Sequence, residues 1–385
     1  MNKLKIGIMV DQLLEGGVQK AAIEQVRELN KLGHISKLLI LMRKKYPTDF
    51  FYLLKGIPYQ YLSDSYPLLF RRTIKFPIFN FLSTSHLISP ILAPKIIKKR
   101  EYDLLVSWGS TTCLTANTLY KINKIPYIAI IHDPFVYILK KVYSKTLMRG
   151  FFPLIKPILE SLEGILVRDA VGTILISKVH SKYMKGAHGV NPSIVPLGVA
   201  ISKRVPSSRG SNILSFGRWQ KEKNPQFILK LAKQFPNEKF VIAGSWIEKG
   251  EYFWFKSLIK KQGLKKRVKL IPHFNDKELA SLCKNAILFL HPHFETFGLA
   301  ALEAAGYGLP IIIPKRSGVT ENFKHGVHGF FPKDVSIVEY KKYMNSLLSN
   351  RKLAKEMGIK AREVVKRKFS WKSKVQDMLN LIDNN

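Results

Sequence analysis

The sequence predicts an α/β protein made of two consecutive halves, each with its own parallel sheet. Short apolar runs alternate along the chain with longer segments of helical periodicity, a pattern typical of parallel sheets covered by helices on both faces. The alternation pauses in a stretch rich in Pro, Gly and Ser near residue 200 and then resumes. The chain has 385 residues, which is more than one hydrophobic core normally holds, so we expect two domains.

In the first half, the segment 4–10 (LKIGIMV) predicts a buried strand, and its internal Lys5 argues against a signal peptide. The loop DQLLEGGVQ follows, and residues 20–33 then have helical spacing and end on a glycine. Further strands of this half are predicted at 36–42, 103–108, 126–131 and 172–177.

The second half repeats this order after a polar linker. We place the first domain at 1–198, the linker at 199–211 and the second domain at 212–370. The C-terminal segment is helical with a break near 369–371, so a last helix covers 371–385. The strands of the second half are predicted at 212–218, 239–245, 267–273, 287–293 and 309–314.

Composition limits the possible partners. Lys and Arg total 63 against 27 Asp and Glu, a formal charge of +36, which suits nucleic acid, an anionic membrane or a phosphorylated substrate. The two cysteines, Cys113 and Cys283, have no metal-ligand spacing, so we expect neither a disulfide framework nor a zinc site. A reducing compartment fits this cysteine usage. No uncharged apolar run of about 18 residues predicts a membrane-spanning helix.

Two loops after predicted strands carry groups that suit an anion. The pair Gly16 and Gly17 follows the first strand, where backbone N–H groups can approach a phosphate, although a plain strand-to-helix turn has the same sequence. Gly217, Arg218 and Lys223 follow the first strand of the second domain. Two cations on one loop suit a diphosphate, although in so basic a chain they could equally be solvated.

A third loop, HPHFETFGLAALEAAG (291–306), contains two carboxylates eight positions apart. Glu295 stands at the predicted mouth of a helix, where Phe297, Gly298 and Leu299 offer free N–H groups that suit phosphate or sugar oxygens. Glu303 lies roughly 10 Å farther along at about 1.5 Å per residue. The two carboxylates could hold hydroxyls at opposite ends of a nucleotide sugar, or they could simply complement the helix dipole and face solvent.

Residues 268–331 resemble the nucleotide-sugar site of glycosyltransferase family 4, whose E-x7-E motif corresponds to Glu295 and Glu303. The glycine–arginine and lysine–asparagine pattern of that family corresponds to Gly217–Arg218 and Lys223–Asn224. The resemblance covers nearly the whole chain.

Outside this site, IVPLGV (194–199) resembles the hinge strand of the family, and FSW (369–371) resembles the start of its terminal helix. The segments GGV (16–18) and IIHDP with His132 are similar to the first-domain side of the family's cleft. One departure is Ala200, where the hinge commonly carries Asp.

The resemblance implies a GT-B architecture, in which two Rossmann-like domains face each other across a cleft and the helix 371–385 packs back on the first domain. It implies transfer of a hexose from a nucleotide diphosphate sugar to a hydroxyl, with retention of the anomeric configuration. No cofactor and no metal are expected, in agreement with a sequence that has no D-x-D pair.

The resemblance also implies roles for the site residues. Arg218, Lys223 and the helix-start amides would stabilise the leaving diphosphate. Glu295 would hold sugar hydroxyls and Glu303 the ribose. His132 would touch the transferred sugar, although a lone histidine is often structural.

Basic residues mixed with aromatics occur at 68–82, 94–102 and 137–156, all in the first domain, where the family binds acceptors. This mixture suits an anionic membrane, so we expect a cytoplasmic protein at the inner membrane face with a glycan or glycolipid acceptor. A soluble charged surface with aromatic core positions is the other interpretation. No obligate protein partner is evident.

Two other functions remain open at this stage. One is a GT-B transferase that acts on protein or nucleic acid. The other is a non-catalytic nucleic-acid-binding protein, in which phosphate contacts would explain the charge of +36. The second alternative gives no reason for the donor-site motifs.

Overall fold

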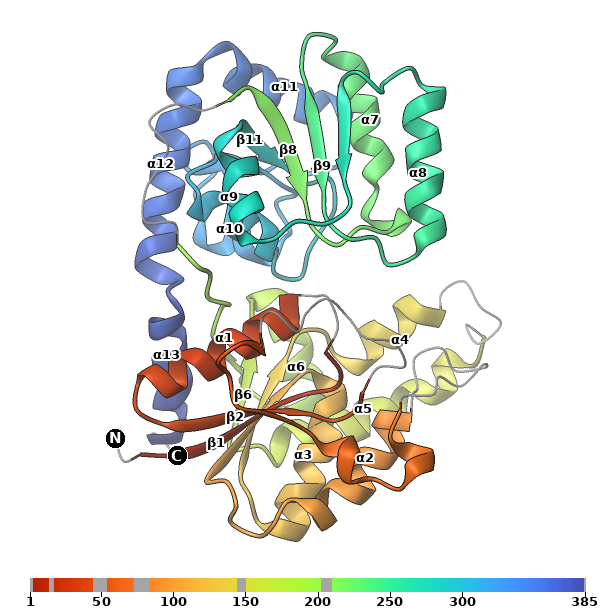
Figure 1. Ribbon diagram of the computed structural model, residues 1–385, viewed down its shortest axis with the longest axis vertical. Helices are drawn as coiled ribbons and strands as arrows, with labels where there is room; N and C mark the ends of the chain where they lie inside the picture. Colours follow the sequence, from red (N-terminus) through yellow and green to blue (C-terminus); the bar gives the residue numbers. More distant parts are fainter. Residues whose placement is uncertain are drawn as a thin grey trace. The chain divides into compact units, whose positions relative to one another are not determined.

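The computed structural model describes residues 3–13, 17–43, 54–72, 84–143, 150–201 and 210–383. The chain divides into two compact units (Figure 1). The first comprises Met1–Leu197 together with Trp371–Asn385, and the second comprises Gly198–Ser370. Most of the predicted linker, residues 202–209, lies outside the described residues.

A parallel sheet forms the centre of the first unit. Among the described residues it has seven strands in the order β3-β2-β1-β4-β5-β6-β7. All neighbouring strands are parallel, and Ile6 of β1 pairs with Ser36 of β2 on one side and Leu104 of β4 on the other. The strands are β1 (Lys5–Val10), β2 (Ile35–Ile40), β3 (Tyr59–Tyr61), β4 (Leu104–Trp108), β5 (Tyr127–Ile131), β6 (Gly172–Leu175) and β7 (Ser193–Ile194).

Helices cover both faces of this sheet because successive strand residues point to opposite sides. Met9, Leu105 and Ala129 pack into a core with α2, α3 and α5, whereas Trp108 and Ile130 meet α1 and α13. Helix α13 lies beside α1 (Figure 1). The helices are α1 (Gly17–Lys31), η2 (Leu62–Ser65), η3 (Leu68–Phe70), α2 (Thr84–Ile96), α3 (Ser110–Asn123), α4 (Phe135–Tyr143), α5 (Phe152–Arg168), η5 (Lys178–His180), α6 (Ser181–His188) and α13 (Trp371–Asp383).

The second unit repeats the design. Among the described residues its parallel sheet has six strands in the order β10-β9-β8-β11-β12-β13. The strands are β8 (Asn212–Phe216), β9 (Phe240–Ala243), β10 (Val268–Ile271), β11 (Ala286–Leu290), β12 (Ile311–Ile312) and β13 (Gly329–Phe330). The helices are η6 (Lys221–Lys223), α7 (Pro225–Gln234), α8 (Lys249–Lys261), α9 (Asp276–Lys284), α10 (Leu299–Gly306), η7 (Gly318–Asn322), α11 (Ile337–Ser349) and α12 (Arg351–Lys368).

Some boundaries differ from the sequence prediction. Helix α1 begins at Gly17 rather than at residue 20, so the preceding loop is shorter than predicted. The strand predicted at 309–314 contains only Ile311–Ile312. The predicted break near 369–371 is confirmed, because α12 ends at Lys368 and α13 begins at Trp371. Within the described chain, no helix combines the length and the apolar composition needed to cross a membrane.

The strand order reverses direction at one point in each sheet. Consecutive strands first extend the sheet from β1 or β8 toward one edge, and β4 or β11 then adds on the opposite side. In open parallel sheets, ligands bind beyond the carboxyl ends of the strands at such a reversal. The loops after β8 and β11 are therefore the places in the second unit where a ligand is expected.

Candidate functional site

The loops after β8 and β11 bring two predicted site residues together. These strands are hydrogen-bonded neighbours, for example through the pair Phe289 and Leu214, so their following loops leave the sheet side by side. Lys223 Nζ lies 2.6 Å from Glu295 Oε1, although the two residues are 72 positions apart in sequence. The side chains retain 18% and 27% of their exposure, so a solute can reach this ion pair.

The Lys223 side of the site is fixed by a buried tryptophan. The Trp219 ring is fully buried, and its Nε1 donates to the Ala243 carbonyl at 2.9 Å. Lys223 then ends the short helix η6, and Asn224 adopts a left-handed conformation (φ 56°) before Pro225 opens α7. This turn places the lysine at the carboxyl edge of the sheet.

The Glu295 side is held by the segment around η7. The Glu295 N–H donates to Ser317 Oγ at 3.3 Å, and its carbonyl accepts from the Gly318 N–H at 3.1 Å. Gly298 precedes α10 with φ 102°, and a Cβ there would lie 3.0 Å from Val319 Cγ1. Only glycine adopts this conformation without strain. The loop that carries Glu295 is therefore tightly specified.

His291 is a third member of this site that the sequence analysis did not single out. Its Nε2 lies 3.5 Å from Glu295 Oε1, and its ring packs at a tilt of 37° against Trp219, with the ring centroids 5.1 Å apart. The ring is almost fully buried, and Nδ1 has no hydrogen-bonding partner among the described residues. The sequence feature that could have identified His291 is its position directly after an apolar strand.

The charges of the site are strongly coupled. Burial lowers the pKa of His291 to about 3, so the imidazole is neutral at physiological pH. Burial alone would raise the pKa of Glu295, but the charge of the nearby Lys223 ammonium and its hydrogen bond outweigh burial and hold this pKa below its usual range. The site therefore contains an ionised carboxylate, an ammonium and a neutral imidazole.

The remaining predicted residues of the second unit surround this pair. Gly217 and Arg218 directly follow β8, and Arg218 is exposed. Phe297 is buried, and its carbonyl accepts from the Val319 N–H at 2.6 Å. Leu299 is the first residue of α10, so its N–H belongs to the unpaired first turn. Glu303 lies in the middle of this helix and is half-buried.

The other predicted site residues belong to the first unit. His132 follows β5 and stacks on Trp108 at 5.4 Å. Burial lowers its pKa to about 4, and its Nε2 has no hydrogen-bonding partner within the part of the chain that is described. Gly17 is the exposed first residue of α1. Gly16 lies outside the described residues.

Family models match both units. A model described as Glycosyltransferase Family 4 matches residues 15–203, and one described as Glycosyl transferases group 1 matches residues 201–364. The chain belongs to glycosyltransferase family 4. With two Rossmann-like domains and parallel sheets, this family member has the GT-B fold.

Individual relatives are distant. An uncharacterized glycosyltransferase of Methanocaldococcus jannaschii is 23% identical over 306 residues, which are 73% of this chain and 75% of that protein. A D-inositol 3-phosphate glycosyltransferase of a Mycobacterium species is 24% identical over 205 residues, which are 49% of this chain and 47% of that protein. The solved structure of Anabaena HepE in complex with UDP and glucose has a TM-score of 0.75 and 18% identity, covering 99% of this chain and all of that one.

Proposed function

We propose that this family 4 glycosyltransferase transfers a hexose from a nucleotide diphosphate sugar to a hydroxyl acceptor with retention at the anomeric carbon. The observation that carries the proposal is the ion pair between Lys223 and Glu295 at the strand-order reversal of the second unit. Lys223, which suits a diphosphate, and Glu295, which suits sugar hydroxyls, thus lie in contact at the edge of the sheet where parallel sheets bind ligands. The similar HepE structure contains UDP and glucose, which supports a nucleotide sugar as donor.

In this proposal the two ends of the donor have separate partners. Lys223 and Arg218 neutralise the leaving diphosphate, and the first N–H groups of α10 add a positive field at the helix start. Glu295, at the mouth of α10, accepts hydrogen bonds from hydroxyls of the transferred sugar. Glu303, one helical turn after Leu299, accepts from the ribose. The neutral His132 of the first unit contacts the transferred sugar.

The chemistry proposed here needs no cofactor and no metal ion. As the bond between the anomeric carbon and the phosphate oxygen breaks, negative charge grows on the diphosphate. Two side-chain cations and oriented amides can stabilise that charge, because preorganised donors act strongly in a partly desolvated site. The acceptor oxygen forms the new bond to the anomeric carbon, and its proton passes to an oxygen of the departing diphosphate.

A lipid-linked or envelope glycan acceptor is supported by one helix of the first unit. Phe151, Leu154 and Ile158 lie on one face of α5 and its start, at helical spacing, and are 57%, 73% and 68% exposed. An exposed apolar stripe on so basic a chain suits the interface of an anionic membrane. We therefore propose peripheral attachment at the cytoplasmic membrane face.

The test begins with the donor. UDP-, GDP- and ADP-hexoses are incubated with the protein and a mixture of membrane glycolipids, and release of nucleoside diphosphate is measured together with the product's anomeric configuration by proton NMR. We expect one nucleotide class to turn over, with the donor configuration kept in the product. An inverted product would overturn retention. Binding of none of these nucleotides in calorimetry would overturn the donor assignment.

A further inference from the structure

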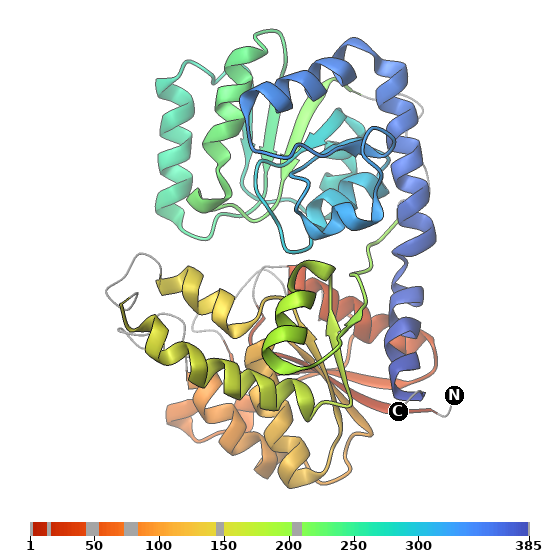
Figure 2. The same cartoon turned by 180° about the vertical axis from the view of Figure 1, so that it is seen from behind.

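A hollow on the first unit has none of the predicted donor residues among the described residues that line it. It has a volume of about 570 Å³ and is open to solvent, a size within the range of small-molecule sites. Its walls are α4, α5 and α6, which pack against one another around α5 (Figure 2). The residues that line it are Val136, Tyr137, Lys140, Phe152, Lys156, Glu160, Lys182, Tyr183, Gly186 and Ala187.

The hollow is positively charged. Lys140, Lys156 and Lys182 each come from a different wall, and Glu160 is the one acidic residue of the described lining. Lys156 Nζ lies 3.6 Å from Glu160 Oε1, which neutralises one of the three ammonium groups. Among the described residues, neither Lys140 nor Lys182 has an ion-pair partner. Two positive charges therefore remain for an anion.

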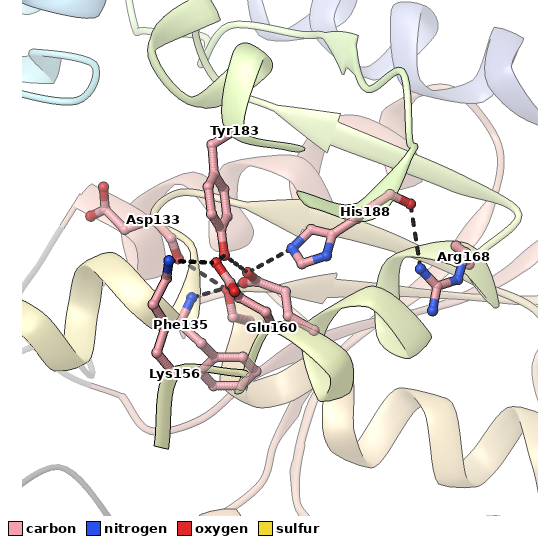
Figure 3. Close-up of polar contacts among 9 residues, drawn as sticks. Asp133, Phe135, Lys156, Glu160, Arg168, Tyr183 and His188 are labelled. Carbon is pink, nitrogen blue, oxygen red and sulfur yellow. Dashed lines mark hydrogen bonds and ion pairs between the residues drawn. The ribbon is translucent and has the colours of Figure 1, made fainter. Parts of the chain in front are cut away.

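A buried polar network holds the walls in place. Glu163 is fully buried on α5, and its carboxylate accepts from the Phe135 N–H at the start of α4 at 2.8 Å. The same carboxylate lies 3.1 Å from His188 Nε2 and 3.4 Å from the Tyr183 hydroxyl, both on α6 (Figure 3). All three helices are thus tied to one side chain. Breaking such a buried network is costly, so it stabilises the arrangement of the three walls.

Aromatic rings complete the lining. The Tyr137 and Tyr183 rings meet edge to face at 5.3 Å. The Tyr183 hydroxyl lies 3.5 Å from Glu160 Oε1 and points toward it in Figure 3. Burial, followed by the Glu163 and Glu160 carboxylates, raises the pKa of Tyr183 above its usual range, so the phenol stays a hydrogen-bond donor. Such a lining suits a phosphate that is attached to a sugar or an apolar chain, because the cations can bind the phosphate and the flat rings can pack against the attached group.

Two walls of the hollow start at the same edge of the first sheet. Helix α4 follows β5 and α6 follows β6, so both helices begin at the carboxyl edge of the sheet. That edge binds ligands in such sheets, and His132 stands three residues before α4. We infer that this hollow binds a phosphate group of the acceptor, with Lys140 and Lys182 as its counter-ions. The inference rests on the proposed transferase function and names the chemistry of its acceptor.

The test uses the full chain with saturating UDP present, so that the donor site is occupied. Calorimetry measures the binding of glycerol phosphate, octyl phosphate and, as an uncharged control, octyl glucoside. The variant is Lys140→Ala/Lys182→Ala, and the matched control is Lys185→Ala, an exposed lysine one turn from Lys182 on α6 that does not line the hollow. The melting temperature of each variant confirms folding.

We expect the double variant to bind both phosphates about tenfold more weakly, because two solvent-screened ion pairs are lost. Lys185→Ala should change the dissociation constant of either phosphate by less than about twofold. Tighter binding of octyl phosphate would identify a lipid phosphate as the source, and equal binding of the two phosphates a soluble one. The inference is wrong if the double variant binds phosphates normally, or if Lys185→Ala weakens them equally. Absence of UDP binding to the unaltered protein would instead count against the proposed transferase function.

Discussion

Removing the charge of Glu295 should tighten the binding of free UDP, although Glu295 belongs to the proposed donor site. The Glu295 carboxylate forms an ion pair with the Lys223 ammonium at 2.6 Å. A diphosphate must therefore compete with this carboxylate for the ammonium. Glu295→Gln keeps the size of the side chain and ends the competition.

The size of the expected change in UDP affinity follows from the solvent exposure of the ion pair between Lys223 and Glu295. With 18% and 27% of the two side chains exposed, the pair is partly screened by solvent and is worth roughly 0.5–1 kcal/mol. At about 1.4 kcal/mol per factor of ten, UDP should bind roughly two- to fivefold more tightly to Glu295→Gln. Glu303→Gln should act in the opposite direction, since weakening a charge-assisted bond to the ribose costs about 1.5 kcal/mol, or about tenfold.

Calorimetry with UDP and with a UDP-hexose distinguishes these effects. Glu295→Gln should gain affinity for UDP yet lose turnover with the sugar donor, because its hydroxyl partner is the hexose. Glu356→Gln, an exposed residue of α12, is the matched control and should change neither. If Glu295→Gln weakens UDP as much as Glu303→Gln does, the assignment of the two carboxylates to opposite ends of the donor is wrong.

Four further predictions concern the same molecule. Arg218→Ala and Lys223→Ala should each reduce turnover by about 100-fold through loss of a charge-stabilising donor, and near-normal initial rates in both would remove them from the mechanism. Turnover should persist in EDTA, and a complete loss that Mn²⁺ restores would contradict metal-independent departure of the diphosphate. Binding to anionic liposomes should weaken with salt and with Leu154→Asp in sedimentation assays, whereas equal binding to neutral liposomes would refute the membrane proposal. Because the folded state lowers the pKa of His291 from 6.5 to about 3, the unfolded state binds more protons between these values and stability falls as pH falls through this window. Between pH 6.5 and 5 in urea titrations, the free energy of unfolding of His291→Asn should therefore fall by about 1–2 kcal/mol less than that of the unaltered protein. An identical pH dependence of the two proteins would show that the His291 ring does not cause the loss of stability.

The strands could be predicted best where both faces of the sheet bury them. The central strand β5 is a continuous apolar run, and its predicted start at residue 126 differs from the observed start, Tyr127, by one residue. The edge strands β3 and β13 were not predicted, because Tyr59–Tyr61 and Gly329–Phe330 are too short to show a period. Their existence depends on a neighbouring strand that offers hydrogen bonds, which is a property of the sheet.

The sequence identified individual residues of the site but not the contact between Lys223 and Glu295. A sequence pattern placed Lys223 and Glu295 on loops after strands, yet it assigned each to a different piece of the ligand. Their direct contact follows from the strand order, in which β8 and β11 are neighbours. His291 was not identified because a single histidine after a strand has many structural explanations. Its burial and an Nδ1 that lacks a partner among the described residues distinguish it.

The discontinuity of the first unit has a consequence for synthesis on the ribosome. The unit ends at Leu197 and resumes at Trp371, so its last helix emerges only after the whole second unit. Until then, the surface of α1 against which α13 buries Val375, Met378 and Leu379 stays exposed. A nascent or truncated chain that stops before residue 371 would expose this surface of α1, which would favour chaperone binding or aggregation. Synthesis of α13 therefore completes the apolar packing around α1 in the first unit.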